Sequence, residues 1–196
     1  PVSIEEIGKN IVERAFAEGW ITAEIPANRT GKKIAVIGSG PSGLAAAQQL
    51  NRAGHWVTVF ERADRIGGLL RYGIPDFKMG KSVIDRRIKI LEQEGIRFKT
   101  STVIGVDISR EQLDKDYDAV VFCGGSTIAR DLPAPGREIN GVVQAMQFLP
   151  QQNRRVAGDA ESTIANPILA TGKHVIVIGG GDTGSDCIGT SMRQGA

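Results

Sequence analysis

Three glycines near the start of the chain are spaced as in a loop that binds phosphate. Gly38, Gly40 and Gly43 follow the apolar run 33–37 and open the Ala-rich segment 44–50. With this spacing the first glycine permits a tight turn, the second lets the backbone approach a pyrophosphate, and the third lets a helix pack against a sheet. Free backbone N–H groups and the positive end of the helix dipole would hold the negative charge.

A carboxylate stands where the same kind of site needs a ribose contact. Glu61 ends a second apolar run, 55–60, and lies 18 residues beyond Gly43, so it could bond the hydroxyls of an adenosine ribose. An acid there would repel a 2′-phosphate, which disfavours NADP at this site. A glycine turn of this spacing is weak evidence alone. Strand, glycines, helix, second strand and terminal acid together predict a dinucleotide-binding βαβ unit rather than a structural turn.

The glycine pattern occurs a second time, near the carboxyl end. Gly179, Gly181 and Gly184 follow the apolar run 173–178 and would have the same three roles. One such unit suggests a binding module, whereas two suggest electron transfer between two dinucleotides, with FAD on the first and NAD(P)H on the second. The sequence ends at Ala196, before a second strand and its ribose residue, and we interpret the chain as an excised portion.

These motifs need a scaffold, and the sequence predicts an α/β fold. We expect a Rossmann-like FAD-binding domain with a parallel sheet (31–140), an N-terminal helical segment (1–30), an interdomain connection (141–171) and the start of a second Rossmann-like, NAD(P)-binding domain (172–196). Helices are predicted at 3–18, with a Ser3–Glu6 capping box, at 82–94, capped by Ser82, at 109–114 and within 141–149. Strands are predicted at 97–103 and at 117–123.

Three details of this scaffold can be checked directly. The strand ending at Gly124 and Gly125 reads as a central one whose Phe122 and Cys123 belong to the core. The polar stretch 151–155 reads as a solvated face. Residues 62–79 form a long ordered loop in which the pair Gly67-Gly68 could run close beneath a planar cofactor; a flexible surface turn is the alternative.

The composition excludes several classes of function. The chain has 196 residues, 41% hydrophobic and 23% charged, with a formal charge of +2, which gives no strong field for nucleic acid or an anionic membrane. No apolar run approaches the roughly 20 residues of a membrane span, so we expect a cytoplasmic protein. Cys123 and Cys187 lack CxxC or metal-ligand spacing, which disfavours a disulfide, a metal or iron–sulfur site, and a thioredoxin-reductase-like enzyme.

Several longer motifs resemble the small (beta) subunits of NADPH-dependent glutamate synthases. They include Gly38-Ser-Gly-Pro-Ser-Gly-Leu-Ala-Ala-Ala, Gly67-Gly-Leu-Leu-Arg-Tyr-Gly-Ile-Pro-Asp-Phe-Lys-Met, Leu149-Pro-Gln-Gln-Asn-Arg-Arg and Gly179-Gly-Gly-Asp-Thr-Gly-Ser-Asp-Cys-Ile-Gly-Thr. The resemblance covers essentially the whole chain, including its opening helix. Dihydropyrimidine dehydrogenase and the ferredoxin-linked transhydrogenases have similar flavin domains.

The resemblance implies a subunit that takes hydride from NADPH onto FAD and passes electrons through iron–sulfur clusters to a large subunit that makes glutamate. The glycine turn would hold the FAD pyrophosphate, Glu61 its ribose, and Val103 its adenine through backbone contacts. Further residues would line the flavin, close the crevice or begin the NADPH site. The complete set of candidate cofactor residues is Gly38, Ser39, Gly40, Pro41, Ser42, Gly43, Glu61, Arg62, Gly68, Leu69, Arg71, Ile74, Val103, Gly124, Gly125, Gly179, Gly181, Asp182, Thr183 and Gly184.

The chain also departs from this family. The cluster-binding cysteines that precede the opening helix in family members, and the later segment that returns to the flavin, are not in this sequence. The iron–sulfur clusters are therefore expected only in the parent protein, and the chain by itself is not expected to turn over NADPH. No residue of this chain is assigned a catalytic role. Two alternatives remain: a related flavin subunit of another iron–sulfur enzyme, and a non-catalytic nucleotide-binding or docking module.

Overall fold

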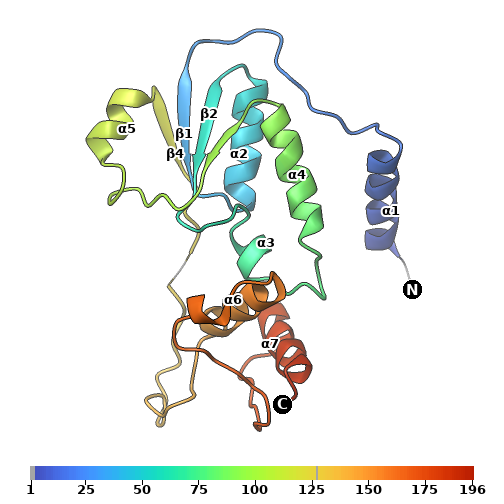
Figure 1. Ribbon diagram of the computed structural model, residues 1–196, viewed down its shortest axis with the longest axis vertical. Coiled ribbons are helices and arrows are strands. Elements are labelled where there is room, and N and C mark those ends of the chain that lie inside the picture. The colour runs from blue at the N-terminus through green and yellow to red at the C-terminus, as the bar shows by residue number, and fades with distance from the viewer. Residues whose placement is uncertain (1–2, 127) are drawn as a thin grey trace.

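A four-stranded parallel sheet forms the upper part of the molecule (Figure 1). The computed structural model describes residues 3–126 and 128–196, so Pro1 and Val2, at the start of the predicted N-terminal segment 1–30, lie outside the described residues. The strands are β1 (Lys33–Ile37), β2 (Trp56–Phe60), β3 (Arg97–Lys99) and β4 (Ala119–Phe122), in the order β3-β2-β1-β4. The predicted α/β class with a parallel sheet is confirmed.

The first βαβ unit forms as the glycine pattern predicts. Strand β1 leads into α2 (Pro41–Arg52), and α2 leads into β2, which pairs with β1 so that Val36 lies beside Val59. Pro41 occupies the first position of the helix, where its missing N–H costs nothing. Along β1 the side chains alternate, so that Ile34 and Val36 join one core cluster and Ala35 joins another.

Helices cover both faces of the sheet. Helices α2 and α4 (Ser82–Gln93) lie on one face and α5 (Arg110–Asp116) on the other (Figure 1). Ser109 caps α5, because its Oγ accepts a hydrogen bond from the Gln112 N–H at 3.2 Å. The predicted cap of α4 is wrong: Ser82 is the first helical residue, and Lys81 precedes it without a capping side-chain bond. Strand β3 is also shorter than expected.

Strand β4 lies at the edge of this sheet, not at its centre, which corrects two predictions. Phe122 is 77% exposed because, among the described residues, no strand pairs with β4 on its outer side. Cys123, which follows, is half-buried and packs against the cluster that contains Ile34 and Val36. Apolar character indicated a strand correctly, but it could not tell which strands have two neighbours.

Helix α1 (Ile4–Ala17) stands beside α4 at some distance from the sheet (Figure 1). Its residues Ile4, Ile7 and Ile11 are 60–72% exposed. Ser3 precedes the helix but makes no side-chain capping bond, so the predicted capping box is absent. The helix contacts α4 through Arg86, which forms an ion pair with Glu13 and lies 3.7 Å from the centre of the Phe16 ring.

The lower part of the molecule consists of α6 (Ala145–Val156), a single 3-10 turn η1 (Glu161–Thr163) and α7 (Asp182–Arg193). Phe148, Leu149 and Ala170 form a small core there, with Cys187 packed against it. The helix expected within 141–149 begins at Ala145 and runs further. The expected strand before the second glycine turn is wrong: the backbone of 174–180 has no partner among the described residues, and Ile176 is 89% exposed. No helix in the described ranges is both long and apolar enough to cross a bilayer.

Candidate functional site

The turn after β1 is fixed by two close backbone approaches. Gly38 has φ +103°, and a Cβ placed there would lie 2.3 Å from the carbonyl oxygen of Cys123. A Cβ at Gly43 would lie 2.0 Å from the carbonyl oxygen of Gly38. Neither position can hold a side chain without movement of the backbone. Gly38 therefore lets the turn pack against the end of β4, and Gly43 lets α2 pack closely against the turn after β1.

Gly40 differs from both, because a Cβ built there meets no atom within 4 Å. It precedes α2 with φ −66° and ψ −179° and makes no side-chain capping bond. Among the described residues, the backbone N–H groups of Ser42 and Gly43 have no acceptor. Two unpaired donors at a helix N-terminus, next to open space, are suited to bind an anion.

Glu61 lies beside this turn at the end of β2, with only 8% of its surface exposed. Its Oε2 accepts hydrogen bonds from the Ser39 N–H at 3.0 Å and the Ser39 hydroxyl at 2.5 Å, and its Oε1 accepts from the Ala63 N–H at 2.8 Å. A carboxylate has about four lone-pair sites, so one acceptor site remains for a ligand. The hydroxyl of Ser39, which is fully buried, accepts the Gly67 N–H at 3.0 Å and thus joins the turn to the following loop. The contact of Ser39 with a cofactor stays a prediction.

The double glycine brings the predicted long loop onto the turn. Gly68 has φ +54°, and a Cβ there would lie 2.9 Å from the Cα of Gly40. The loop then forms the short helix α3 (Leu69–Tyr72), whose Leu69 is 55% exposed. Ile74 is half-buried. Arg71 is largely buried, donates to the Ile66 carbonyl and pairs with Asp85. The segment directly adjoins the glycine turn.

The other candidate residues of the first site are Gly124, Gly125, Arg62 and Val103. Gly124 and Gly125 follow β4 at the same end of the sheet, and the Cα of Gly124 lies 3.3 Å from the Cβ position of Gly38. Arg62 is exposed beside Glu61. The backbone of Val103 is bonded within its own loop, since its N–H donates to Asp107 Oδ2 at 2.7 Å and its carbonyl accepts from two later residues. The backbone contact with adenine is a prediction that requires this loop to open.

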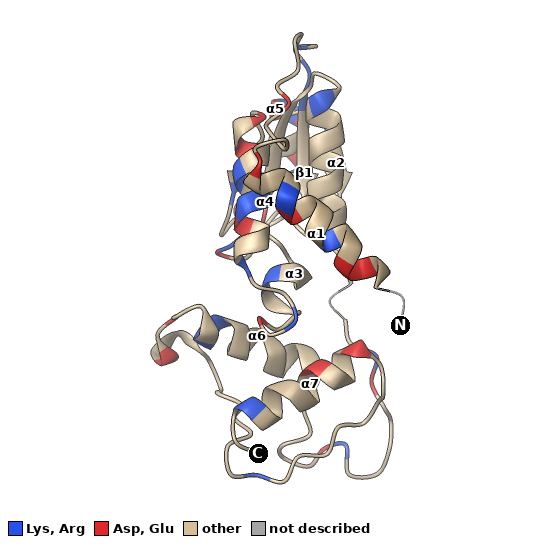
Figure 2. Ribbon diagram, turned by 90° about the vertical axis from the view of Figure 1, so that its right-hand side faces the viewer, with Lys and Arg blue, Asp and Glu red and all other residues tan. Residues whose placement is uncertain are grey.

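The second glycine turn repeats part of the geometry of the first, although no strand among the described residues pairs before it. A Cβ at Gly179 would meet no atom within 4 Å, unlike one at Gly38. Gly179 has φ +120°, and a Cβ at Gly184 would lie 2.5 Å from the Gly179 carbonyl oxygen. Gly181 precedes α7 with φ −80° and ψ −177° and has open space beside it. Asp182 and Thr183 form the exposed first turn of α7. Figure 2 shows acidic residues near the start of α7 and a basic one near its end.

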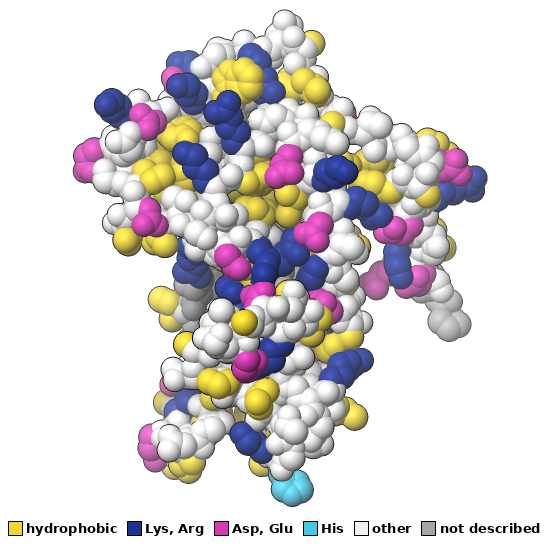
Figure 3. All heavy atoms as spheres, in the orientation of Figure 1, with side chains coloured by type: hydrophobic (Ala, Val, Ile, Leu, Met, Phe, Trp, Pro, Cys, Tyr) yellow, Lys and Arg dark blue, Asp and Glu magenta, His cyan; other side chains and the backbone are white. Residues whose placement is uncertain are grey.

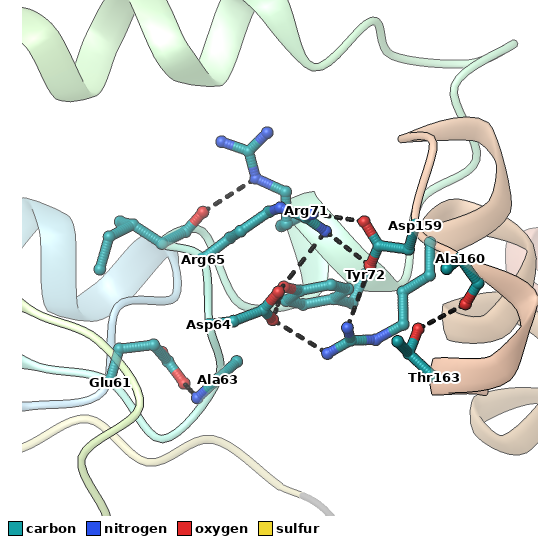
Figure 4. A network of polar contacts seen from close by, with 11 residues as sticks. Glu61, Ala63, Asp64, Arg65, Arg71, Tyr72, Asp159, Ala160 and Thr163 are labelled. Atoms are coloured by element: carbon teal, nitrogen blue, oxygen red, sulfur yellow. Dashed lines mark hydrogen bonds and ion pairs between the residues drawn. The ribbon is translucent and has the colours of Figure 1, made fainter. Parts of the chain in front are cut away.

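A network of charged side chains joins the loop 62–79 to α6 and to Asp159 just beyond it (Figure 4). Arg154 of α6 donates to Asp64 at 2.9 Å and to Asp159 at 3.1 Å, and Arg65 donates to Asp159 at 3.0 Å. The bond from Arg65 lowers the pKa of Asp159. Burial and the bond to Asp64 raise the pKa of Tyr72 to about 12. Basic and acidic side chains gather between the upper and lower parts of the molecule (Figure 3).

Sequence reasoning missed this network. It interpreted 151–155 as a solvated face, whereas Arg154 and Arg155 both pair with acids, Arg155 with Glu161 at 2.7 Å. The partners Asp64 and Arg154 are 90 residues apart in the chain, so no local pattern connects them. The only sequence signal for this ion pair was the charge of the two residues, and a charge alone does not show which residue it pairs with.

Comparisons with known proteins show which family the chain matches. Residues 7–114 and 32–196 match the family described as "Pyridine nucleotide-disulphide oxidoreductase". Over its whole length the chain is 58% identical to the "Glutamate synthase [NADPH] small chain" of Mycobacterium tuberculosis and 53% identical to that of Bacillus subtilis. It covers 41% and 39% of those two proteins. The "Glutamate synthase [NADH]" of Schizosaccharomyces pombe is 54% identical and is covered over 9% of its length.

One solved structure has a similar fold. FprA of Mycobacterium tuberculosis, described as "in complex with NADPH", superposes with a TM-score of 0.57 at 31% identity. The match covers 63% of this chain and 29% of FprA. The chain thus spans less than half the length of each of these relatives.

Proposed function

Since the chain belongs to the pyridine nucleotide-disulphide oxidoreductase family and is a homologue of glutamate synthase small chains, we propose that it holds FAD and begins the NADPH site of such a subunit. The observation that carries this proposal is the open space beside Gly40, flanked by the unpaired N–H groups of α2. A diphosphate could lie there against the helix dipole. Any side chain at Gly40 would fill the same space.

The residues around the turn fit the rest of an FAD molecule. Glu61 is held by Ser39 and Ala63 with an acceptor site to spare, which suits a ribose hydroxyl. Gly68 adjoins Gly40, and Leu69 follows it as the first residue of α3. They would border the flavin and keep water from it. Because these groups are already bonded to the protein, they are positioned before a ligand arrives.

The second turn would receive the diphosphate of NADPH. Gly181 offers the same open space as Gly40, and α7 directs its N-terminus at it. The role of this chain in the reaction is to bind and orient both nucleotides. Bound FAD would supply the redox chemistry, taking hydride from NADPH and releasing electrons.

In the full-length protein, the electrons would pass through iron–sulfur clusters to a large glutamate-forming subunit in the cytoplasm. This path is proposed from the similarity to glutamate synthase small chains. The chain is also similar to an NADH-dependent enzyme, so the preference for NADPH is part of the proposal.

The test is an anaerobic titration of the purified full-length protein with NADPH, followed by flavin absorbance. We expect a yellow protein whose flavin band bleaches on addition of NADPH. A colourless protein that takes up no FAD would overturn the proposal and leave a non-catalytic docking module. A yellow protein that bleaches with dithionite but not with NADPH or NADH would overturn the nicotinamide half.

A further inference from the structure

The loop between α3 and α4 touches α7, so the two glycine turns are physically linked. This loop carries Phe77 and Lys78 and passes close to the start of α7 (Figure 1). Lys78 Nζ lies 2.7 Å from Asp186 Oδ1 and 3.6 Å from Asp182 Oδ1. Both acids belong to α7, whereas Lys78 belongs to the segment that follows the flavin-side glycines. A residue of the first unit thus contributes to the surroundings of the second turn.

The charges at the second turn need a cation if a diphosphate is to bind there. Asp182 is the first residue of α7, directly after Gly181, and its carboxylate is fully exposed. Asp186 lies one helical turn further on, and its side chain is 10% exposed. Two carboxylates near a diphosphate oppose its binding by like-charge repulsion. The ammonium of Lys78 lies closer to both acids than any other cation among the described residues, and the bond to Asp186 raises its pKa.

Apolar packing next to Lys78 fixes the same contact. The ring of Phe77 lies against Gly189 on α7, where an added Cβ would be 2.7 Å from the ring carbon Cζ. The guanidinium of Arg193 lies 3.8 Å from the centre of the Phe77 ring on the same helix. The absence of a side chain at Gly189 is therefore what allows the aromatic ring to pack on α7.

We propose that Lys78 and Phe77 are positioning residues of the nicotinamide nucleotide site, although they lie on the flavin-binding unit. Phe77 packs the loop 62–79 against α7, and Lys78 offsets the negative charge of the two carboxylates beside the second turn. The inference rests on the proposed function, because it assumes that NADPH binds at Gly181. It adds that the flavin unit itself helps to build that site.

The experiment compares Lys78→Met with Lys115→Met in the full-length, FAD-loaded protein. Lys115 is an exposed lysine on α5 that makes no ion pair among the described residues, so it is a matched control. NADP⁺ binding is measured from the perturbation of the flavin spectrum. We expect Lys78→Met to raise the Kd for NADP⁺ about tenfold, with FAD content and reduction by dithionite unchanged. Lys115→Met should behave as wild type.

Rescue separates a charge effect from a loss of packing. Adding Asp182→Asn to Lys78→Met should restore much of the NADP⁺ affinity, because one repelling carboxylate is removed. If Lys78→Met does not accumulate as a folded protein, the Kd for NADP⁺ of the single variant Asp182→Asn tests the inference. This variant should bind NADP⁺ more tightly than wild type. Equal Kd values for Lys78→Met and Lys115→Met, or weaker binding in Asp182→Asn, would overturn the inference. If wild type itself binds no NADP⁺, the proposed function fails instead.

Discussion

One added methyl group should have different effects at the two ends of the glycine turn after β1. Gly43→Ala places a Cβ 2.0 Å from the Gly38 carbonyl oxygen, whereas Gly40→Ala places one in open space. The first change should destabilise the fold, because backbone must move to accept the methyl group. The second should leave the fold intact and remove FAD binding, because the methyl group lies where the diphosphate would run.

The magnitudes follow from the contacts. Overpacking against a backbone atom costs about 3 kcal/mol, and alanine is about 1 kcal/mol more favourable than glycine in a helix. Gly43→Ala should therefore lose about 2 kcal/mol, or about 4–8 °C in Tm for a chain of this size. Gly40 has φ −66°, which alanine adopts freely, so its substitution should stay within about 0.5 kcal/mol. Losing two N–H contacts to phosphate, about 1.5–3 kcal/mol each, should weaken FAD binding at least about 100-fold.

Urea unfolding of the apoproteins and fluorescence titration with FAD measure the two effects separately. The expected pattern is a stable Gly40→Ala that binds FAD at least about 100-fold more weakly and a destabilised Gly43→Ala whose folded fraction still binds FAD. Equal destabilisation by both substitutions would show that the turn has no open side. Wild-type FAD affinity in Gly40→Ala would refute the assignment of the diphosphate to this turn.

Three further results are expected. Glu61→Gln should lower FAD affinity about tenfold in a fluorescence titration. The two carboxylate oxygens of Glu61 accept the bonds from Ser39 and Ala63, whereas a glutamine amide has only one acceptor oxygen and would leave none for the ribose. Unchanged affinity would contradict the ribose role. Burial raises the pKa of Glu94, but hydrogen bonds from Arg52, the Glu24 N–H and Gln48 outweigh this effect and bring the pKa below 4.5. The ionised Glu94 carboxylate therefore stabilises the fold above pH 4.5, and this contribution is lost as the pH falls further. Thermal melts of Glu94→Gln should accordingly show a smaller acid-induced loss of Tm than wild type, and parallel curves would refute this. Asp159→Asn should speed hydrogen exchange in α6 with FAD affinity unchanged, since it removes the partner of Arg65; unaltered exchange would mean that the network does not hold α6.

The local parts of the fold and of the first site could be predicted from the sequence. Glycine spacing and apolar runs identified β1, α2 and β2, and the distinct roles of Gly38 and Gly43 follow from the need for close backbone approach. Apolar periodicity also located α4 and α5 to within a few residues. These features depend on neighbours in the chain, which a sequence pattern records.

Features that depend on distant partners could not be predicted. Phe122 was expected in the core, yet it is exposed because β4 pairs with a strand on one side only in the part of the chain that the structure describes. The run 173–178 has the composition of a strand but no partner to pair with among the described residues. Ser39 and Glu61 are 22 residues apart, and no local pattern indicated that the Ser39 hydroxyl bonds this carboxylate. In each case the physical cause is a contact, or a missing contact, with a residue far away in sequence.

A crystal structure of the FAD-loaded, full-length protein tests the central claim most directly. We expect the diphosphate of FAD beside Gly40, with its oxygens about 3 Å from the N–H groups of Ser42 and Gly43, and a ribose hydroxyl on Glu61. A flavin bound away from this turn, with Gly40 facing solvent and Glu61 bonded only to Ser39 and Ala63, would contradict it.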